Sequence, residues 1–594
     1  MFKFPKYINI LSTLLVALTI LLFWGIIYPH HLLYQEQFQL FQFSFDYLIA
    51  TLSIPGGFAD YTGRFLTQFY YYPWIGACII TSLLLIFQIF IWQITKALTL
   101  FPPKPFYPLT FIPVLLVFHF LCDENSMLSF IIALLLSLTG SLANTLFKKS
   151  SHRRFFELSL APLLFYLVGG ASVVFILLSI LYEWTQSKKS HSGWFRYSLI
   201  LLSIYICTIF TFRYITNYPL LRIIQGINYY RYPVPNNATT TIILLVAIVP
   251  FIISFLSRHL KVNRLFLLWI IFMVLIIGTG YGWIYQSLDL AKEEAFAFDY
   301  LARMRQWTDI LKRAEKKKPS SSMAMSCLNL ALAQTGQLGE KMFTYPQYDG
   351  RESLLPSYQR DMITPLYAGE VYYHLGMVNT SQRYAFEAME SIPDHQKSVR
   401  CYKRLVETNI INGNYIIAAK HIRILKKTFY YRNWAFKMEQ YLNDEDAINN
   451  HPEFGLLRKC AFKDDFYFNN ETQDIMLAFL LKSNPNNRIA FEYLMALKLI
   501  EKDLQGFLNF YPLGQEIPYL YIPKHFQEAL IFTWSVNQKK LEDLPWKISI
   551  QTIEQMNAFA SVFNATPSEN RNLKLKKFST TFWYYLLIQK KEHA

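Results

Sequence analysis

The sequence predicts an all-α protein in which a polytopic bundle of transmembrane helices is followed by a soluble α-helical repeat domain. The 594-residue chain is 53% hydrophobic, which is high for a soluble protein. Its long apolar runs are confined to residues 1–286, and residues 287–594 instead carry short amphipathic helices with recurring glycines. We therefore expect a membrane domain over 1–286 and a second domain over 287–594.

About nine spans are expected in the first domain, because a run of about 20 apolar residues can cross a bilayer as a helix. The expected spans are apolar runs bounded by polar loops. They are Ile8–Tyr28, Ile75–Trp92, Leu109–Leu121, Met127–Phe147, Glu157–Trp184, Tyr197–Tyr214, Thr240–Leu256 and Leu265–Tyr285. The run Glu157–Trp184 counts twice because its two flanks are both basic, which requires an even number of crossings. Gly169 and Gly170 mark the expected break, and one long tilted helix is the alternative.

Basic residues set the expected orientation. The net charge is +16, and much of it lies in short loops such as Lys148–Arg154 and Ser257–Lys261. The positive-inside rule places these loops and the N-terminus in the cytoplasm and everything after Ser287 outside. No nucleic-acid-binding motif accompanies the basic charge, so no nucleic-acid partner is expected.

A large first outer loop, residues 29–74, combines charged residues with many aromatic residues. Glu36 and Gln37 closely follow the first span, where Glu36 could act as a general base and Gln37 could contact substrate. Asp60 and Arg64 are four residues apart, so on a helix they could pair. Asp60 is therefore either a second catalytic carboxylate or one half of a structural ion pair.

Two further outer loops carry candidate ligand-binding residues. Asp123 and Glu124 could bind a divalent cation, since hard cations prefer oxygen ligands, or they form a solvated turn. No cofactor is certain, and a divalent cation is the one candidate. Arg213, Arg222 and Arg231 could hold a phosphate group bidentately. They could equally contact membrane lipids or the second domain.

The second domain is expected to begin with one charged helix, Asp289–Lys318, and to continue as short helix pairs. Gly336, Gly376 and Gly413 recur at roughly the period of helix–turn–helix repeats. The pattern resembles degenerate tetratricopeptide repeats. Such repeats present a concave surface to a protein or peptide partner.

The layout of the first domain resembles the GT-C membrane glycosyltransferases. The resemblance rests on an inside N-terminus, a long outer loop with the early carboxylate Glu36, and the acidic second outer loop at Asp123 and Glu124. Glu36–Phe38, Gly56–Gly57 and Gln68–Pro73 are similar in layout to YfhO-type members. The sequence departs from the superfamily in having Glu-Gln in place of an Asp-containing motif, and an adjacent acidic pair in place of DxD. The whole chain also resembles a multi-pass membrane family of unassigned function found in Bacteroidota.

The resemblance implies a lipid-linked sugar transferase of envelope glycan assembly in the bacterial inner membrane, with the second domain periplasmic. Such enzymes use polyprenyl-phosphate sugar donors. The alternative hypothesis is a non-enzymatic envelope scaffold with a periplasmic platform for a protein partner. A transporter is disfavoured because the spans are expected to contain few buried charges and show no clear inverted repeat.

Overall fold

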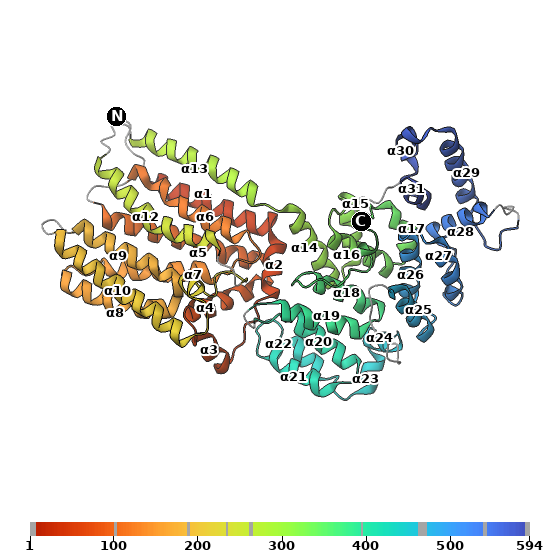
Figure 1. Ribbon diagram of the computed structural model, residues 1–594, viewed down its shortest axis with the longest axis horizontal. Coiled ribbons are helices and arrows are strands. Elements are labelled where there is room, and N and C mark those ends of the chain that lie inside the picture. Colours follow the sequence, from red (N-terminus) through yellow and green to blue (C-terminus); the bar gives the residue numbers. More distant parts are fainter. Residues whose placement is uncertain are drawn as a thin grey trace. The chain divides into compact units, whose positions relative to one another are not determined.

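The protein folds as two helical units (Figure 1). The structure is a computed structural model that describes residues 7–99, 104–186, 191–232, 236–259, 265–347, 349–393, 396–460, 472–537 and 543–588. Over these residues it contains helices and no β-strand, which confirms the all-α prediction. The first unit comprises Met1–Asp289, Ile392–Val399 and Lys427–Tyr430, and the remaining residues form the second unit. Lys188 and Lys189, in the basic flank that follows Trp184, and Lys261, in the loop Ser257–Lys261, lie outside the described residues.

The first unit contains thirteen α-helices within the described residues. They are α1 (Ile8–Leu22), α2 (Pro29–Gln37), α3 (Phe45–Leu52), α4 (Gly57–Thr67), α5 (Pro73–Leu98), α6 (Phe111–Leu121), α7 (Ser129–Asn144), α8 (Ser150–Val168), α9 (Val173–Gln186), α10 (His191–Ile215), α11 (Leu220–Gln225), α12 (Asn237–His259) and α13 (Leu265–Ser287). Short turns of other helix types at Phe23–Ile27, Gln68–Tyr71, Lys104–Thr110 and Gly169–Ser172 extend or join them.

Seven helical stretches of the described chain are long and apolar enough to cross a membrane. They are Ile8–Ile27, Pro73–Leu98, Lys104–Leu121, Ser150–Gln186, Gly193–Ile215, Asn237–Arg258 and Leu265–Ser287. Ser150–Gln186 folds as the two helices α8 and α9, and the shorter apolar helix α7 also belongs to the bundle. The described residues therefore supply about nine bundle helices, in agreement with the sequence, and the chain is a multi-pass membrane protein.

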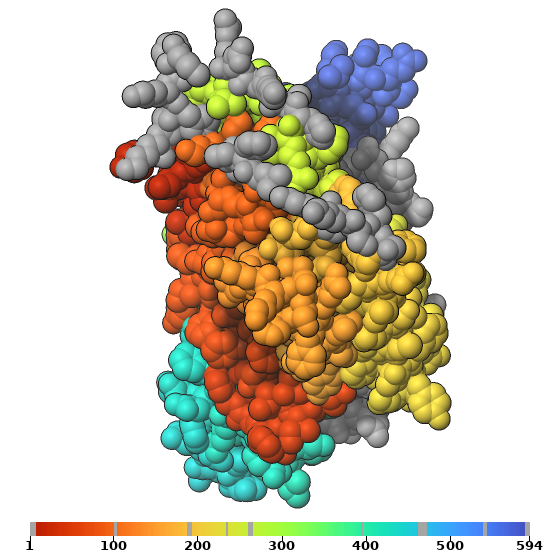
Figure 2. Space-filling model, turned by 90° about the vertical axis from the view of Figure 1, so that its left-hand side faces the viewer, coloured from red at the N-terminus to blue at the C-terminus, as the bar shows by residue number. Residues whose placement is uncertain are grey.

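Helix α7 lies at the centre of the bundle. Nearly all of its side chains are buried, and it packs against α4, α5, α8 and α9. A helix that is apolar all round is expected in such a position. In the end-on view, the orange segments lie between the red N-terminal segments and the yellow ones (Figure 2). Helix α1 instead exposes leucines such as Leu11 and Leu14, as a lipid-facing helix does.

The run Glu157–Trp184 is a helical hairpin, which confirms the interpretation as two helices. Gly169 breaks the helix with φ 71° and ψ −144°, a conformation in the positive-φ range that favours glycine. Arg153 and Arg154, near the start of α8, both bind Glu183 near the end of α9, the latter at 3.0 Å. The two helices therefore run in opposite directions. Helix α8 begins at Ser150 and not at Glu157, and its 19 residues reach about 28 Å, so it is longer than the sequence suggested.

The second unit contains eighteen α-helices within the described residues. They are α14 (Leu290–Arg303), α15 (Trp307–Lys316), α16 (Ser322–Gln334), α17 (Leu338–Lys341), α18 (Thr364–Leu375), α19 (Val378–Ser391), α20 (Val399–Ile411), α21 (Tyr415–Lys426), α22 (Arg432–Glu439), α23 (Glu445–Asn450), α24 (Phe454–Cys460), α25 (Gln473–Ser483), α26 (Arg488–Ile500), α27 (Leu504–Phe510), α28 (Lys524–Val536), α29 (Ile550–Ala565), α30 (Arg571–Lys574) and α31 (Phe582–Leu587).

One turn type joins successive helices of this unit. At Gly336, Gly376 and Gly413 the chain has φ of 69°, 96° and 75°. The residue after each glycine donates its backbone N–H to a carbonyl five residues earlier, as Met377 does to Tyr372 at 2.9 Å. This is the Schellman termination of a helix. Arg305 and Lys502 adopt the same conformation with φ of 58° and 63°. Because Arg305 ends α14, the expected single helix Asp289–Lys318 is wrong, and two helices occupy that range.

Two short segments of the later sequence belong to the first unit. The backbone N–H of Leu40 donates to the carbonyl of Lys397 at 3.1 Å, and that of Phe43 donates to the carbonyl of Lys427 at 2.7 Å. The Tyr430 ring stacks on Tyr71 with centroids 4.7 Å apart and planes at 6°. These segments flank the pair α20–α21, and no sequence pattern predicted their membership.

Reporter fusions test the orientation. Fusions after Lys149, Lys189 and Lys261 should report the cytoplasm, and fusions after Gly57, Asn237 and Ser320 the opposite side, because basic loops are retained inside. The α8–α9 hairpin requires Lys149 and Lys189 to give the same result. An external signal at Lys189 alone would contradict the hairpin.

A fragment that begins at Leu290 should fold alone, because one hydrophobic core of the second unit joins residues between Phe298 and Tyr384 to residues between Met476 and Tyr585. Circular dichroism should show a helical spectrum and a cooperative melt.

In this fragment the segments 392–399 and 427–430 lack their contacts with Leu40, Phe43 and Tyr71. Trypsin should therefore cleave after Lys397 and Lys427. The same bonds should resist trypsin in the full chain, and equal cleavage of both proteins would contradict the assignment of these segments.

Candidate functional site

Four connecting segments meet at one end of the helix bundle, and we call them the loop layer: residues 28–72, 122–128, 169–172 and 216–232. Ser126 and Tyr230 form an antiparallel bridge. On either side of it, Met127 N–H donates to the Tyr229 carbonyl at 3.0 Å, and Arg231 N–H donates to the Asn125 carbonyl at 2.8 Å. The second and third expected outer loops are therefore joined through their backbones.

The first loop and the hairpin turn complete this layer. The Gln35 side chain on α2 donates to the Ser126 carbonyl at 3.3 Å. Gly56 N–H donates to the Tyr166 carbonyl near the end of α8 at 2.9 Å. The Tyr229 hydroxyl accepts from the Ala171 N–H at 2.9 Å and donates to the Val168 carbonyl. The layer thus brings together loops that are far apart in the sequence.

Asp60 and Arg64 form the ion pair that their spacing predicted. Both lie on α4, and Arg64 contacts the two oxygens of Asp60 at 2.7 and 3.0 Å. The Asp60 side chain is 1% exposed and that of Arg64 14%. Burial alone would lower the pKa of Arg64, but the Asp60 carboxylate beside it raises that pKa above its ordinary value. Arg64 also donates to the Tyr47 hydroxyl at 3.3 Å.

Arg231 is fully buried, with 0% of its surface exposed. Its guanidinium lies over the Phe38 ring at 4.7 Å and donates to the Phe38 carbonyl at 3.4 Å. Among the described residues, no carboxylate lies within ion-pair distance of Arg231, and its Nε and Nη2 lack hydrogen-bond partners. Burial lowers its pKa, and Arg64 adds a like charge nearby. Arg231 is therefore a buried cation without a paired anion in the described chain.

The other two candidate arginines lie in different surroundings. Arg213 is exposed on α10. Arg222 is half-buried on α11, where it lies over the Tyr218 ring at 5.1 Å and donates to the Ile227 carbonyl at 3.3 Å. The three arginines thus do not share one environment, and Arg231 lies near enough to Arg64 for that like charge to lower its pKa.

Asp123 and Glu124 lie half-buried in the layer. Asp123 accepts hydrogen bonds from the Tyr230 hydroxyl at 2.7 Å and from the Asn125 N–H at 2.9 Å. The pKa of Tyr230 is raised, mainly because the side chain is buried and secondly because it donates a hydrogen bond to Asp123. Within the described ranges, no group of three or more His, Cys, Asp or Glu side chains is arranged to hold a metal ion.

Glu36 and Gln37 are both 3% exposed on α2. The Gln37 side chain donates to the Leu33 carbonyl at 3.1 Å. The pKa of Tyr430 is raised, first by burial and then by the nearby Tyr72 and Glu36. Tyr430 therefore lies close to Glu36. The sequence analysis did not single out Tyr430, although the aromatic run Phe429–Tyr431 stands in a half of the chain without long apolar runs.

A second group of buried charges in the membrane bundle was also missed. Arg153, Glu157 and Glu183 lie on the hairpin, at the end opposite the loop layer. Glu157 is 0% exposed and accepts hydrogen bonds from Asn144 and Tyr197. The expectation that the spans hold few buried charges therefore has an exception in α8–α9.

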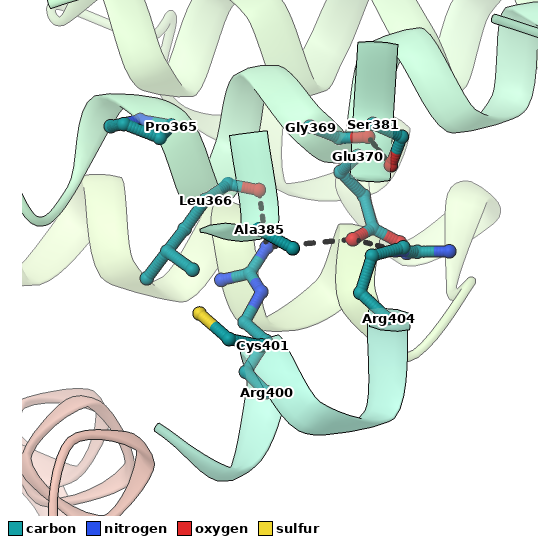
Figure 3. Close-up of a pocket in the computed structure, with 9 residues that line it drawn as sticks. All are labelled: Pro365, Leu366, Gly369, Glu370, Ser381, Ala385, Arg400, Cys401 and Arg404. Carbon is teal, nitrogen blue, oxygen red and sulfur yellow. Dashed lines mark hydrogen bonds and ion pairs between the residues drawn. The ribbon is translucent and has the colours of Figure 1, made fainter. Parts of the chain in front are cut away.

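The second unit has its own buried ion network, on α14, α18 and α20. Figure 3 shows three of its members, Glu370, Arg400 and Arg404. Arg400 binds both oxygens of Asp299 at 2.7 and 2.9 Å, and Arg404 binds Glu370 at 2.8 Å. Burial would raise the pKa of Glu370, but Arg404 and Arg400 hold it well below its usual range. The small pocket there is lined by these cations together with their anion Glu370. The network therefore fastens three helices together.

Asp60→Asn tests how much the Asp60–Arg64 ion pair contributes to the stability of the protein. The substitution leaves Arg64 buried without its anion, so the free energy of unfolding should fall by about 3 kcal/mol. Thermal melting of the full chain in detergent measures this. The control is Asp46→Asn at an exposed position, which should change stability by less than about 0.5 kcal/mol. Equal melting of the two variants would show that the pair contributes little.

Comparison with known proteins assigns the chain to a family. No curated protein and no solved structure is significantly similar to this chain. One family matches over residues 4–589, nearly the whole length of both units. The chain belongs to this family, which is described as a family of unknown function, DUF6057.

Proposed function

We propose that this protein is an integral membrane glycosyltransferase-like enzyme that uses a lipid-linked sugar donor in envelope glycan assembly. One observation carries the proposal: the loop layer buries Glu36, Asp60 and Arg231, and most of Arg64, at one end of a membrane bundle. Burying charge is costly, and perturbed charged groups gather at functional sites. The end of a bundle is also where the headgroup of a membrane-embedded donor arrives.

The donor phosphate is assigned to Arg231. A buried guanidinium presents planar donors that match a phosphate bidentately, and low polarity strengthens that contact. Two of its nitrogens lack hydrogen-bond partners in the described chain. Arg64 is already held by Asp60 and adds positive charge nearby. In this proposal Asp60 orients Arg64. Gln37, the neighbour of Glu36 in the sequence, contacts the substrate.

Glu36 is the general base. It takes the proton of an acceptor hydroxyl as that oxygen bonds to the anomeric carbon of the sugar. The bond from this carbon to the phosphate oxygen breaks at the same time, and the lipid phosphate leaves toward Arg231. Asp123 and Glu124 could add a divalent cation, but no third side chain of the described residues joins them, so no step is assigned to a metal.

The second unit would recruit the acceptor. Its Schellman-linked helix pairs support the tetratricopeptide-like interpretation, and such arrays bind peptides or proteins along a concave face. We propose that the protein lies in the bacterial inner membrane, with a cytoplasmic N-terminus and the second unit in the periplasm. The basic loops at the end opposite the loop layer support this orientation.

Glu36→Gln tests the catalytic assignment. The amide keeps the shape and hydrogen bonding of Glu36 but cannot accept the proton, so sugar transfer in proteoliposomes should fall by about 10²–10⁴-fold. The melting temperature should stay unchanged. Asp46→Asn, in the same loop but exposed, should keep full activity, whereas full activity of Glu36→Gln would refute the assignment.

A scaffold without enzymatic activity is the second candidate. It is favoured by the internal contacts that Asp60 and Asp123 already make with Arg64 and Tyr230. Two variants distinguish the candidates in a deletion strain: Glu36→Gln, and the double variant Asp123→Asn with Glu124→Gln. If both complement fully, the scaffold replaces the enzyme.

A further inference from the structure

Helix α3, Phe45–Leu52, presents three different faces. Thr51 is 7% exposed and, like Tyr47, turns toward the protein, where the Tyr47 hydroxyl bonds Arg64 and the Leu40 carbonyl. Phe45 and Ile49 are large and apolar, yet 72% and 53% exposed. Asp46 and Ala50 are also exposed. Ser44 caps the helix by accepting from Tyr47 N–H, so these faces are fixed.

The angular order of these residues is informative, because successive side chains on a helix are about 100° apart. Leu48, Leu52, Phe45 and Ile49 fall within one arc of about 100°. Asp46 and Ala50 occupy the next arc, and Tyr47 and Thr51 the third. A helix on the surface of a soluble domain needs only two faces, one apolar and one polar. Three faces indicate three surroundings: protein, water and an apolar phase.

The depth of α3 is set by the hairpin. The Leu52 carbonyl accepts from the Tyr166 hydroxyl at 2.7 Å. Tyr166 lies in the last turn of α8, three residues after Leu163, which is 52% exposed. Because α8 belongs to the membrane bundle, α3 lies beside the last turn of a bundle helix, at the loop-layer end. Tyr72 and Trp74, at the start of α5, are each 51% exposed, and exposed aromatics mark the membrane interface.

We propose that α3 lies in the plane of the membrane interface, with Phe45 and Ile49 in the acyl region of the lipids and Asp46 directed to water. The partner is the lipid bilayer, because the apolar arc continues the lipid-facing surface of α8 and ends beside a charged arc. Helix α3 leads directly into α4, so the anchor fixes the Asp60–Arg64 pair at headgroup depth. The inference does not depend on the proposed transferase activity.

Spin labelling tests the proposal on the full chain in phospholipid vesicles. Cys78 and Cys207, the exposed cysteines, are first replaced by serine. Single cysteines then replace Phe45, Ile49, Asp46 and Ala50, and each carries a nitroxide. All four positions are exposed, so the labels displace no packed side chain. Leu15 on α1 serves as the lipid reference and the exposed Asp446 as the water reference.

Power saturation compares collisions with oxygen, which concentrates in lipid, and with a water-soluble nickel chelate. Labels at 45 and 49 should behave as the label at 15, and labels at 46 and 50 as the label at 446. If labels at 45 and 49 collide mainly with the nickel chelate, α3 lies in water and the proposal is wrong. If those two labels are immobile and shielded from both reagents, a protein partner covers the helix, and the lipid assignment is equally overturned.

Discussion

Polar groups at the end of an apolar helix bundle must find their partners within the protein, and this constraint shapes the loop layer. The polar groups of each connecting segment find their partners in another connecting segment. Residues 125–127 pair with 229–231 through their backbones, and the Gln35 side chain donates to the Ser126 carbonyl. The Tyr229 hydroxyl accepts a hydrogen bond from the Ala171 N–H in the hairpin turn. Because every segment depends on the others, the layer holds its charged side chains at fixed positions. Arg231 meets this constraint only in part, since the described chain supplies it with carbonyl and aromatic contacts but no anion.

Local rules predicted the local features. The spacing of Asp60 and Arg64 predicted their pairing on one helix, and basic flanks with a central glycine pair predicted the α8–α9 hairpin. The glycine-marked turns of the second unit were found for the same reason, since glycine tolerates positive φ. Arg305 and Lys502 form the same turn without glycine, so composition could not reveal them, and one long helix was expected where two exist.

Tertiary features could not be predicted in this way. Asp299, Glu370 and Arg400 meet from three helices, and each resembles an ordinary surface charge in the sequence. Glu157 looks like the polar edge of a span until Asn144 and Tyr197 are seen to bind it. Tyr430 and Tyr71 are separated by hundreds of residues, so no periodic pattern links them. The sequence therefore predicted most of the architecture, but not which of the three candidate arginines is buried.

The hairpin has a consequence for how this architecture can change. A single added span would reverse the side of the membrane on which every later segment lies. Two antiparallel helices that share the Arg153–Glu183 clamp return the chain to its starting side, so as a pair they are neutral for topology. A lineage could gain or lose such a pair, or alter its length, without inverting the large unit that follows. Because the Arg153–Glu183 ion pair holds α8 and α9 together, the two helices behave as one structural unit.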